Sequence, residues 1–267
     1  MKFVTYRPPP PLGRFVYLWS WEAPETPDGL DRILPKGTMG IILNLAEDEV
    51  RWYDAGDERR CRRDSGSVLV GPYADHFVID KAEQRFVMGA EFAPGGAAPF
   101  FAPPASALVG QHVALDALWG READFLRERV LAARTAEERL RIFASVLVDR
   151  LARPLETHPA VEYALARFAE DTPVAAVSDR LGMSPARFIR TFSDTVGLTP
   201  KRYLRVRRFQ NALASLAAAT SPSLADLGLS CGYYDQAHFI HDFRAFAGMT
   251  PTEYLACPRD YNHVTLD

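Results

Sequence analysis

Along the first 110 positions of the chain, apolar residues occur in short runs that are separated by turn residues. Glycine, proline, aspartate and serine, which favour turns, lie between the runs. Short runs of this kind predict β-strands, and several in succession are typical of an antiparallel sandwich or a small barrel. The candidate strands are FVYLWSW (15–21), MGIILNL (39–45), VRWY (50–53), SVLV (67–70), HFVID (76–80) and FVMGAEF (86–92).

From residue 115 onward, apolar side chains recur at steps of three and four, which is the spacing of one helix face. Residues 115–153 therefore predict two amphipathic helices with a break near Thr135. These helices either pack against the β-rich region or present an apolar stripe that forms a homodimer seam with a second copy. The segment RPLETHP (153–159) ends the helical pattern and predicts a boundary between domains.

The last third of the chain contains an internal repeat. FIRTFSDTVGLTPKRYL (188–204) and FIHDFRAFAGMTPTEYL (239–255) share phenylalanine, glycine, proline and tyrosine positions at a constant offset. A constant offset indicates that one supersecondary unit is used twice. Between the two copies, residues 200–219 predict one continuous helix of roughly 30 Å, about the length of one turn of DNA.

Each copy of the repeat has the pattern of a helix-turn-helix. Phenylalanines four positions apart lie on one face of a helix, where they reach the core. The glycine that follows fits a left-handed helix stop, and the Thr-Pro pair after it starts the next helix. A short amphipathic helix that ends at glycine precedes each copy, as in a DNA-binding unit. The expected core and turn positions are Phe188, Phe192, Gly197, Pro200, Gly232, Phe239, Phe243, Gly248 and Pro251.

Residues of about 160–256 resemble the paired helix-turn-helix domain of AraC-type transcription regulators. In that family the second unit has a Gly-aromatic turn, a Phe-x-x-x-Phe helix and a Gly-x-[Ser/Thr]-Pro segment. The resemblance implies a transcription regulator, either an activator or a repressor, that binds double-stranded DNA and has RNA polymerase as a possible partner. The residues that carry the resemblance are Leu224, Ala225, Gly232, Tyr233, Phe239, Phe243, Gly248, Thr250, Pro251 and Tyr254.

The N-terminal region resembles the cupin-like sensor domains that precede the paired helices in the same family. The resemblance depends on ILPKGTMGIILNL (33–45) and EFAPGGA (91–97), and it implies an unknown small-molecule effector. We therefore expect an α+β chain with a β-rich barrel or sandwich at 1–114. A helical linker or dimerisation segment follows at 115–158, and an all-α DNA-binding domain at 159–257.

The aromatic residues Tyr17, Trp19 and Trp21 alternate along a predicted strand and so share one of its faces. They either fill the core of the β-rich domain, which is a common role of such side chains, or line an effector pocket. Catalytic cupins carry a His-x-His cluster with a later Glu and His, whereas His76 and His112 stand apart in this sequence. The sequence therefore predicts no metal, no cofactor and no catalytic residue.

The resemblance places base-reading positions on the second helix of each unit. Arg190 is suited to pair with guanine, although holding a phosphate is its alternative role, and Gln236 could read adenine. Relatives commonly have arginine where this chain has His241, and Asp242 beside it would repel DNA, so the second helix is expected to dock more weakly. The reading positions are Ala186, Arg187, Ile189 and Arg190 in the first unit and Gln236, Ala237, His238 and His241 in the second.

The formal net charge of −3 argues against strong overall attraction to nucleic acid. Basic residues nevertheless cluster on the predicted helix between the units, and local placement decides attraction to phosphates. The pattern predicts modest, salt-sensitive binding. The expected phosphate contacts are Lys201, Arg202, Arg205 and Arg208.

Two alternative functions use the same features. The chain could be a cupin-type enzyme or metal-binding protein with a DNA-binding tail, or its helices could form a protein-interaction module. Three distant cysteines, the absence of an apolar run of about 18 residues and the absence of a secretory signal predict reduced thiols and a cytoplasmic protein without a membrane span. The tail PRDYNHVTLD (258–267) shows no pattern that predicts structure.

Overall fold

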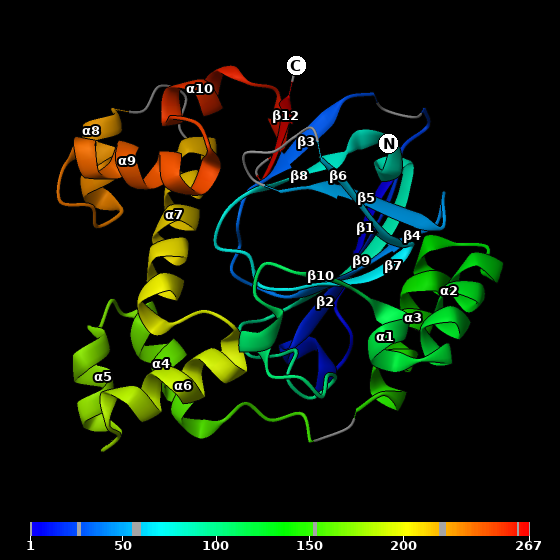
Figure 1. Cartoon of the computed structure of the whole chain (residues 1–267), viewed down its shortest axis with the longest axis horizontal. Helices are drawn as coiled ribbons and strands as arrows, with labels where there is room; N and C mark the ends of the chain where they lie inside the picture. The colour runs from blue at the N-terminus through cyan, green and yellow to red at the C-terminus, as the bar shows by residue number, and fades with distance from the viewer. Residues whose placement is uncertain are drawn as a thin grey trace.

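The computed structural model describes residues 2–25, 28–54, 60–151, 154–218, 223–260 and 262–266. Figure 1 shows a β-rich half beside a helical half, with the long helix α7 standing between the two parts of the helical half. The described strands form two six-stranded antiparallel sheets that do not close into one barrel. This confirms the predicted α+β class.

The first sheet has the strand order β1-β2-β9-β4-β7-β10 and the second the order β11-β12-β3-β8-β5-β6. All six strands predicted from apolar runs are present. The strands of the first sheet are β1 (Lys2–Tyr6), β2 (Val16–Glu22), β9 (Phe86–Phe92), β4 (Gly40–Asn44), β7 (Ser67–Val70) and β10 (His112–Ala114). Those of the second are β11 (Arg259–Asp260), β12 (His263–Leu266), β3 (Leu30–Ile33), β8 (Phe77–Asp80), β5 (Glu49–Tyr53) and β6 (Cys61–Ser65). Three short 3₁₀ helices are η1 (Leu12–Arg14), η2 (Lys81–Arg85) and η3 (Ala105–Leu108).

Three helices cover the outer face of the first sheet: α1 (Leu115–Trp119), α2 (Arg121–Ala132) and α3 (Ala136–Asp149). Leu18 from β2 and Phe143 from α3 are fully buried in the core between them. Burying each such side chain stabilises the fold by about 1.5–3 kcal/mol. The predicted break at Thr135 is the N-cap of α3, where the threonine hydroxyl accepts a hydrogen bond from Glu138 N–H at 3.1 Å. Phe125, Leu131 and Val148 on these helices remain exposed.

The helical half contains the two predicted helix-turn-helix units. The first consists of α4 (Pro159–Ala169), α5 (Val174–Arg180) and α6 (Pro185–Val196), and the second of α8 (Leu224–Ser230), α9 (Gln236–Ala247) and α10 (Pro251–Ala256). The helix α7 (Pro200–Ala218) joins them, as the run without glycine or proline predicts.

Local sequence explains why the reading helices begin and end where they do. The side chains of Ser184 and Asp235 cap the N-terminal ends of α6 and α9 by accepting backbone N–H groups. Gly197 and Gly248 end the same helices with φ angles of 98° and 68°, which non-glycine residues rarely adopt. The four predicted core phenylalanines, Phe188, Phe192, Phe239 and Phe243, are all buried.

The tail beyond α10 returns to the β-rich half, which the sequence did not predict. Strand β12 pairs with the edge of β3 in the register His263↔Ile33 and Thr265↔Asp31. The backbone N–H of Leu34 donates to the Asn262 carbonyl at 2.9 Å, so the pairing continues past the strand. Val264 is fully buried, in the same core as helices α7, α9 and α10. The end of the helical half therefore shares a sheet and a core with the β-rich half.

A chain that ends at Asp260 tests this strand. It should lose about 2–4 kcal/mol of unfolding free energy, because it forgoes the burial of Val264 and several backbone hydrogen bonds. Thermal unfolding followed by calorimetry measures the loss, with a chain that ends at Leu266 as the control. Equal melting temperatures for the two chains would contradict the pairing of β12 with β3.

Candidate nucleic-acid interface

The first reading helix, α6, presents its predicted base-reading residues to solvent. Because successive residues advance by about 100° around a helix, the inward-facing Phe188 and Phe192 leave the neighbouring positions outside. The side chain of Arg190 is 86% exposed, and its Nε lies 3.7 Å from Asp194 Oδ2 in a loose intrahelical pair. Such exposed pairs contribute little, so Arg190 is available to another partner. Ala186, Arg187 and Ile189 are also exposed.

The second reading helix, α9, is arranged in the same way. Gln236, Ala237 and His238 are exposed at its first turn, and the His241 side chain is 81% exposed one turn further on. The carboxylate of Asp242 is buried and accepts a hydrogen bond from Arg205 Nη2 at 2.7 Å. It also lies 3.9 Å from His238 Nε2 and 4.0 Å from His241 Nδ1. The Arg205 guanidinium offsets the charge of this carboxylate, and the expected repulsion of DNA by Asp242 stays a prediction.

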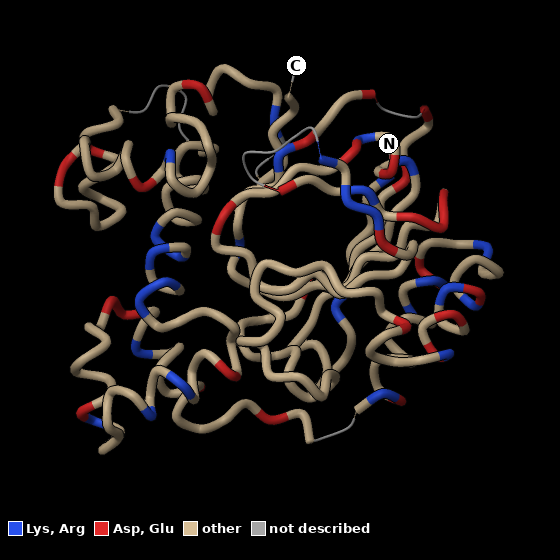
Figure 2. The backbone as a smooth tube through the Cα atoms, viewed as in Figure 1, with Lys and Arg blue, Asp and Glu red and all other residues tan. Residues whose placement is uncertain are grey.

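The basic residues gather along α7, between the two units (Figure 2). Arg205 is held by Asp242, and this hydrogen bond raises the pKa of its guanidinium. Arg202 Nη2 lies 2.7 Å from Asp75 Oδ2 of the β-rich half. Within the described part of the chain, Lys201 and Arg208 have no acidic partner within 4.0 Å, and the Arg208 guanidinium lies over the Tyr233 ring at 5.2 Å. Lys201 and Arg208 are therefore the predicted phosphate contacts with the fewest competing interactions.

The C-terminal ends of both reading helices contact the β-rich half. Near the end of α6, Ser106 Oγ donates to Asp194 Oδ1 at 2.6 Å. At the end of α9, the His76 N–H donates to the carbonyl of Phe246 at 3.2 Å. Each helix has twelve residues and is therefore about 18 Å long. Both N-terminal ends, which carry the reading residues, consequently lie away from the sheets, at one edge of the molecule (Figure 1).

A cavity of about 140 Å³ lies between the two sheets, lined mainly by apolar side chains. Of the three aromatics predicted for an effector pocket, Trp19 lines the cavity and Tyr17 lines an adjoining hollow that shares Lys36 with it. Trp21 does not line the cavity and lies against the ring of Phe3, with centroids 6.2 Å apart.

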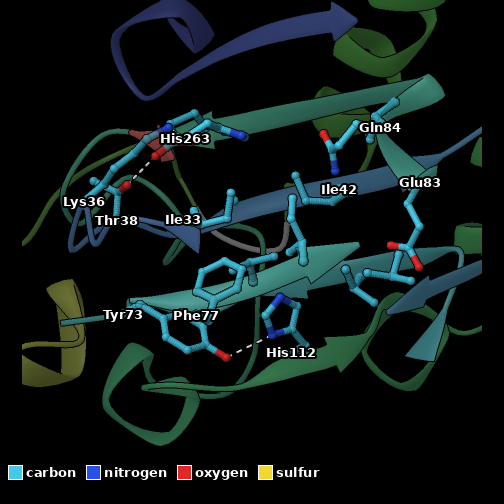
Figure 3. A pocket seen from close by; sticks show the side chains of 18 of the residues that line it. Ile33, Lys36, Thr38, Ile42, Tyr73, Phe77, Glu83, Gln84, His112 and His263 are labelled. Carbon is cyan, nitrogen blue, oxygen red and sulfur yellow. Dashed lines mark hydrogen bonds and ion pairs between the residues drawn. The ribbon is translucent and has the colours of Figure 1, made fainter. Parts of the chain in front are cut away.

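The cavity lining includes two polar groups, His112 and Glu83, whose position in a cavity the sequence did not predict. The His112 ring stacks on Trp52 at 4.3 Å, and its Nδ1 lies 2.9 Å from the Tyr73 hydroxyl. Burial lowers the pKa of His112 to about 3, so the ring is neutral, and its other nitrogen points into the cavity (Figure 3). Elsewhere on the wall, burial raises the pKa of Glu83 to about 8, although Arg51 Nε lies 3.0 Å away. A few polar groups in an apolar cavity are typical of small-molecule sites.

The described ranges contain neither a metal-binding cluster nor a membrane-spanning helix. Among those residues, no three His, Cys, Asp or Glu side chains converge in a way that could hold a metal ion. Their helices also include none that combines the length and the apolar character needed to cross a membrane.

Comparison with known families gives one match in each half of the chain. Residues 177–256 match the family described as a helix-turn-helix domain, and residues 4–114 match a domain of unknown function (DUF6597). A search of curated proteins gave no match.

Several solved structures are similar to this chain. ToxT from Vibrio cholerae is 11% identical, with a TM-score of 0.48 over 96% of this chain and 98% of that one. An unsaturated fatty acid bound wild-type ToxT from the same organism is 9% identical, with a TM-score of 0.45 over 90% and 94%. A DNA-binding transcriptional dual regulator from Escherichia coli K-12 is 25% identical, with a TM-score of 0.33 over 39% and 96%.

The match to residues 177–256 spans both capped reading helices, α6 and α9, together with α7, α8 and α10. The region that matches the second family supplies the described strands of the two sheets apart from β11 and β12. The chain therefore carries an AraC-type helix-turn-helix domain behind a β-rich N-terminal domain of the DUF6597 family.

Proposed function

We propose that this protein is a sequence-specific DNA-binding transcription regulator and that a small molecule in the N-terminal cavity tunes its affinity for DNA. The observation that carries the proposal is the parallel placement of α6 and α9. Both helices turn their exposed N-terminal residues to the same edge of the molecule, as major-groove reading requires. RNA polymerase would be the partner on which such a regulator acts.

The length of α7 supports binding by both helices at once. Its 19 residues span about 28 Å, close to the length of about 34 Å of one turn of DNA. Two helices joined by a rod of this length can enter successive major grooves on one face of the duplex. Lys201 and Arg208, which lie on the rod, would contact the backbone between the grooves.

The cavity supports the second part of the proposal. Its apolar walls suit a small and mostly apolar molecule, and the neutral His112 offers one hydrogen bond to orient it. A ligand that binds one arrangement of the two halves more tightly than another shifts DNA affinity by the same coupling free energy.

Selection of bound duplexes from random DNA tests the proposal. The purified chain should enrich a motif with two elements whose centres lie about 10 base pairs apart. The same protein with the substitutions Arg190→Ala and Gln236→Ala provides the control, and it should enrich no such motif. Recovery of unrelated sequences by the unsubstituted chain would refute sequence-specific binding.

Arg190→Ala should weaken binding to the selected site by about 1–3 kcal/mol and relax the preference at one base pair, because a bidentate contact to guanine is lost. Competition titrations against duplexes with each base at every position measure both effects. Arg141→Ala, on the exposed face of α3, is the matched control. An equal loss on all sequences would instead make Arg190 a phosphate contact.

Lys201→Gln and Arg208→Gln should each lower the slope of log affinity against log salt concentration by roughly one, since each removes one phosphate contact. Binding to an unrelated duplex at several salt concentrations measures the slope. Arg129→Gln, on α2 of the sensor half, should leave it unchanged. A residue whose substitution leaves the slope at its original value does not contact phosphate.

A further inference from the structure

The loop between β7 and β8, residues 71–76, contacts both helix-turn-helix units. On the side of the first unit, Pro72 packs so closely on Gly197, at the end of α6, that a Cβ there would collide with the proline ring. Asp75 forms its ion pair with Arg202 at the start of α7. The loop therefore holds the junction at which the first reading helix ends and the connecting helix begins.

On the side of the second unit, the same loop holds the end of α9. The N–H of His76 donates to the Phe246 carbonyl, and a Cβ at Gly248 would collide with the His76 ring. Ala74 is buried in the core that the second unit shares with Leu34. Gly197 and Gly248 occupy equivalent positions of the repeat, so one loop touches the equivalent point of both units.

One residue of the loop points the other way, into the sensor half. The ring of Tyr73 lines the cavity and packs on Phe77 with centroids 4.6 Å apart, and its hydroxyl lies 2.9 Å from His112 Nδ1 (Figure 3). Burial raises the pKa of Tyr73, so the hydroxyl stays protonated and can donate to that nitrogen. The other ring nitrogen of His112 then carries its proton toward the cavity, where it can donate to an acceptor.

The loop is also fixed to the segment that carries His112. The Gly71 N–H donates to the Gln111 carbonyl at 2.8 Å, and the Gly110 N–H donates to the Pro72 carbonyl at 3.2 Å. A displacement of His112 is therefore opposed by bonds to the very loop that touches the two units. Packed and hydrogen-bonded elements of this kind transmit displacements between sites.

We propose that the β7–β8 loop couples the cavity to both helix-turn-helix units, and that the effector is a small, mostly apolar molecule with one acceptor oxygen for His112. This inference rests on the proposed function, because it names the ligand class and the route of regulation of the same cavity. A ligand that moves His112 alters the hydrogen bond to Tyr73. The loop then shifts, and its contacts with the ends of α6 and α9 change together.

The coupling is measurable without the effector, by removing the bond at the cavity end and observing the far end of the loop. His112→Phe retains a ring against Trp52 but removes the nitrogen that Tyr73 contacts, and Tyr73→Phe removes the hydroxyl. Both variants should speed hydrogen exchange of the Gly197 and Gly248 amides by about 3–10-fold, the equivalent of one hydrogen bond of about 0.5–1.5 kcal/mol. These two amides close the last turns of α6 and α9.

The same chain supplies internal controls. The amides of Gly182 and Gly232 close the turns after α5 and α8 in the two units. Their exchange should not change, because a Cβ at either glycine would meet no atom of the described sensor half within 4 Å. Ile42→Val, which alters the cavity wall away from the loop, should also leave Gly197 and Gly248 unchanged.

Affinity for the selected DNA site gives the second readout. His112→Phe and Tyr73→Phe should weaken it by about 3–10-fold, because the reading helices lose part of their fixed placement. Unchanged exchange at both Gly197 and Gly248, or a change at only one of them, would overturn the coupling whatever the DNA result. A chain that selects no DNA motif but shows the exchange changes would refute the proposed function and leave the loop as a coupling element.

Discussion

The structure depends on the docking of two helix ends onto one surface of the β-rich half. A helix leaves its last carbonyl groups without partners, and these must be satisfied by other donors. At the end of α9 the β-rich half supplies them: the His76 N–H donates to the Phe246 carbonyl, and Arg32 Nη1 donates to that of Ala247 at 3.2 Å. The positive charge of Arg32 also lies at the negative end of the helix dipole, which adds to the attraction.

The same docking involves both copies of the repeat. Gly197 and Gly248 end the two reading helices in a conformation that favours glycine, and the missing side chains admit Pro72 and His76. Because the C-terminal ends are held inward, the N-terminal ends project outward. Strand β12 adds a second tie, since it joins the end of the second unit to the sheet that carries β3. If the reading helices bind DNA as proposed, fixing them beforehand reduces the conformational entropy that is lost on association.

Local signals predicted much of the fold. Apolar runs located six strands, and the capping residues and glycine stops located the reading helices, because these signals act within a few residues. Strands β6 and β3 escaped prediction since CRRDS and LDRI lack apolar runs. Strand β12 escaped because its stability comes from pairing with a segment more than two hundred residues away.

For the candidate site, too, the sequence predicted local features and missed long-range ones. Helical periodicity explains why the reading positions, such as Arg190, are exposed, while their contacts with bases stay a prediction. Long-range pairs were not predictable: Arg205 with Asp242, Arg202 with Asp75, and Tyr73 with His112 each join residues from different elements. The sequence presents these residues only as separate charged or polar positions, and the fold gives each one a specific partner.

The most direct measurement of the central claim is a methylation-protection footprint of the chain on its selected site. The two reading helices, with their N-terminal ends at one edge of the molecule, should protect guanine N7 atoms in two major-groove segments. These segments should lie on one face of the duplex, about 10 base pairs apart. Protection of a single segment, or of segments on opposite faces, would contradict the account.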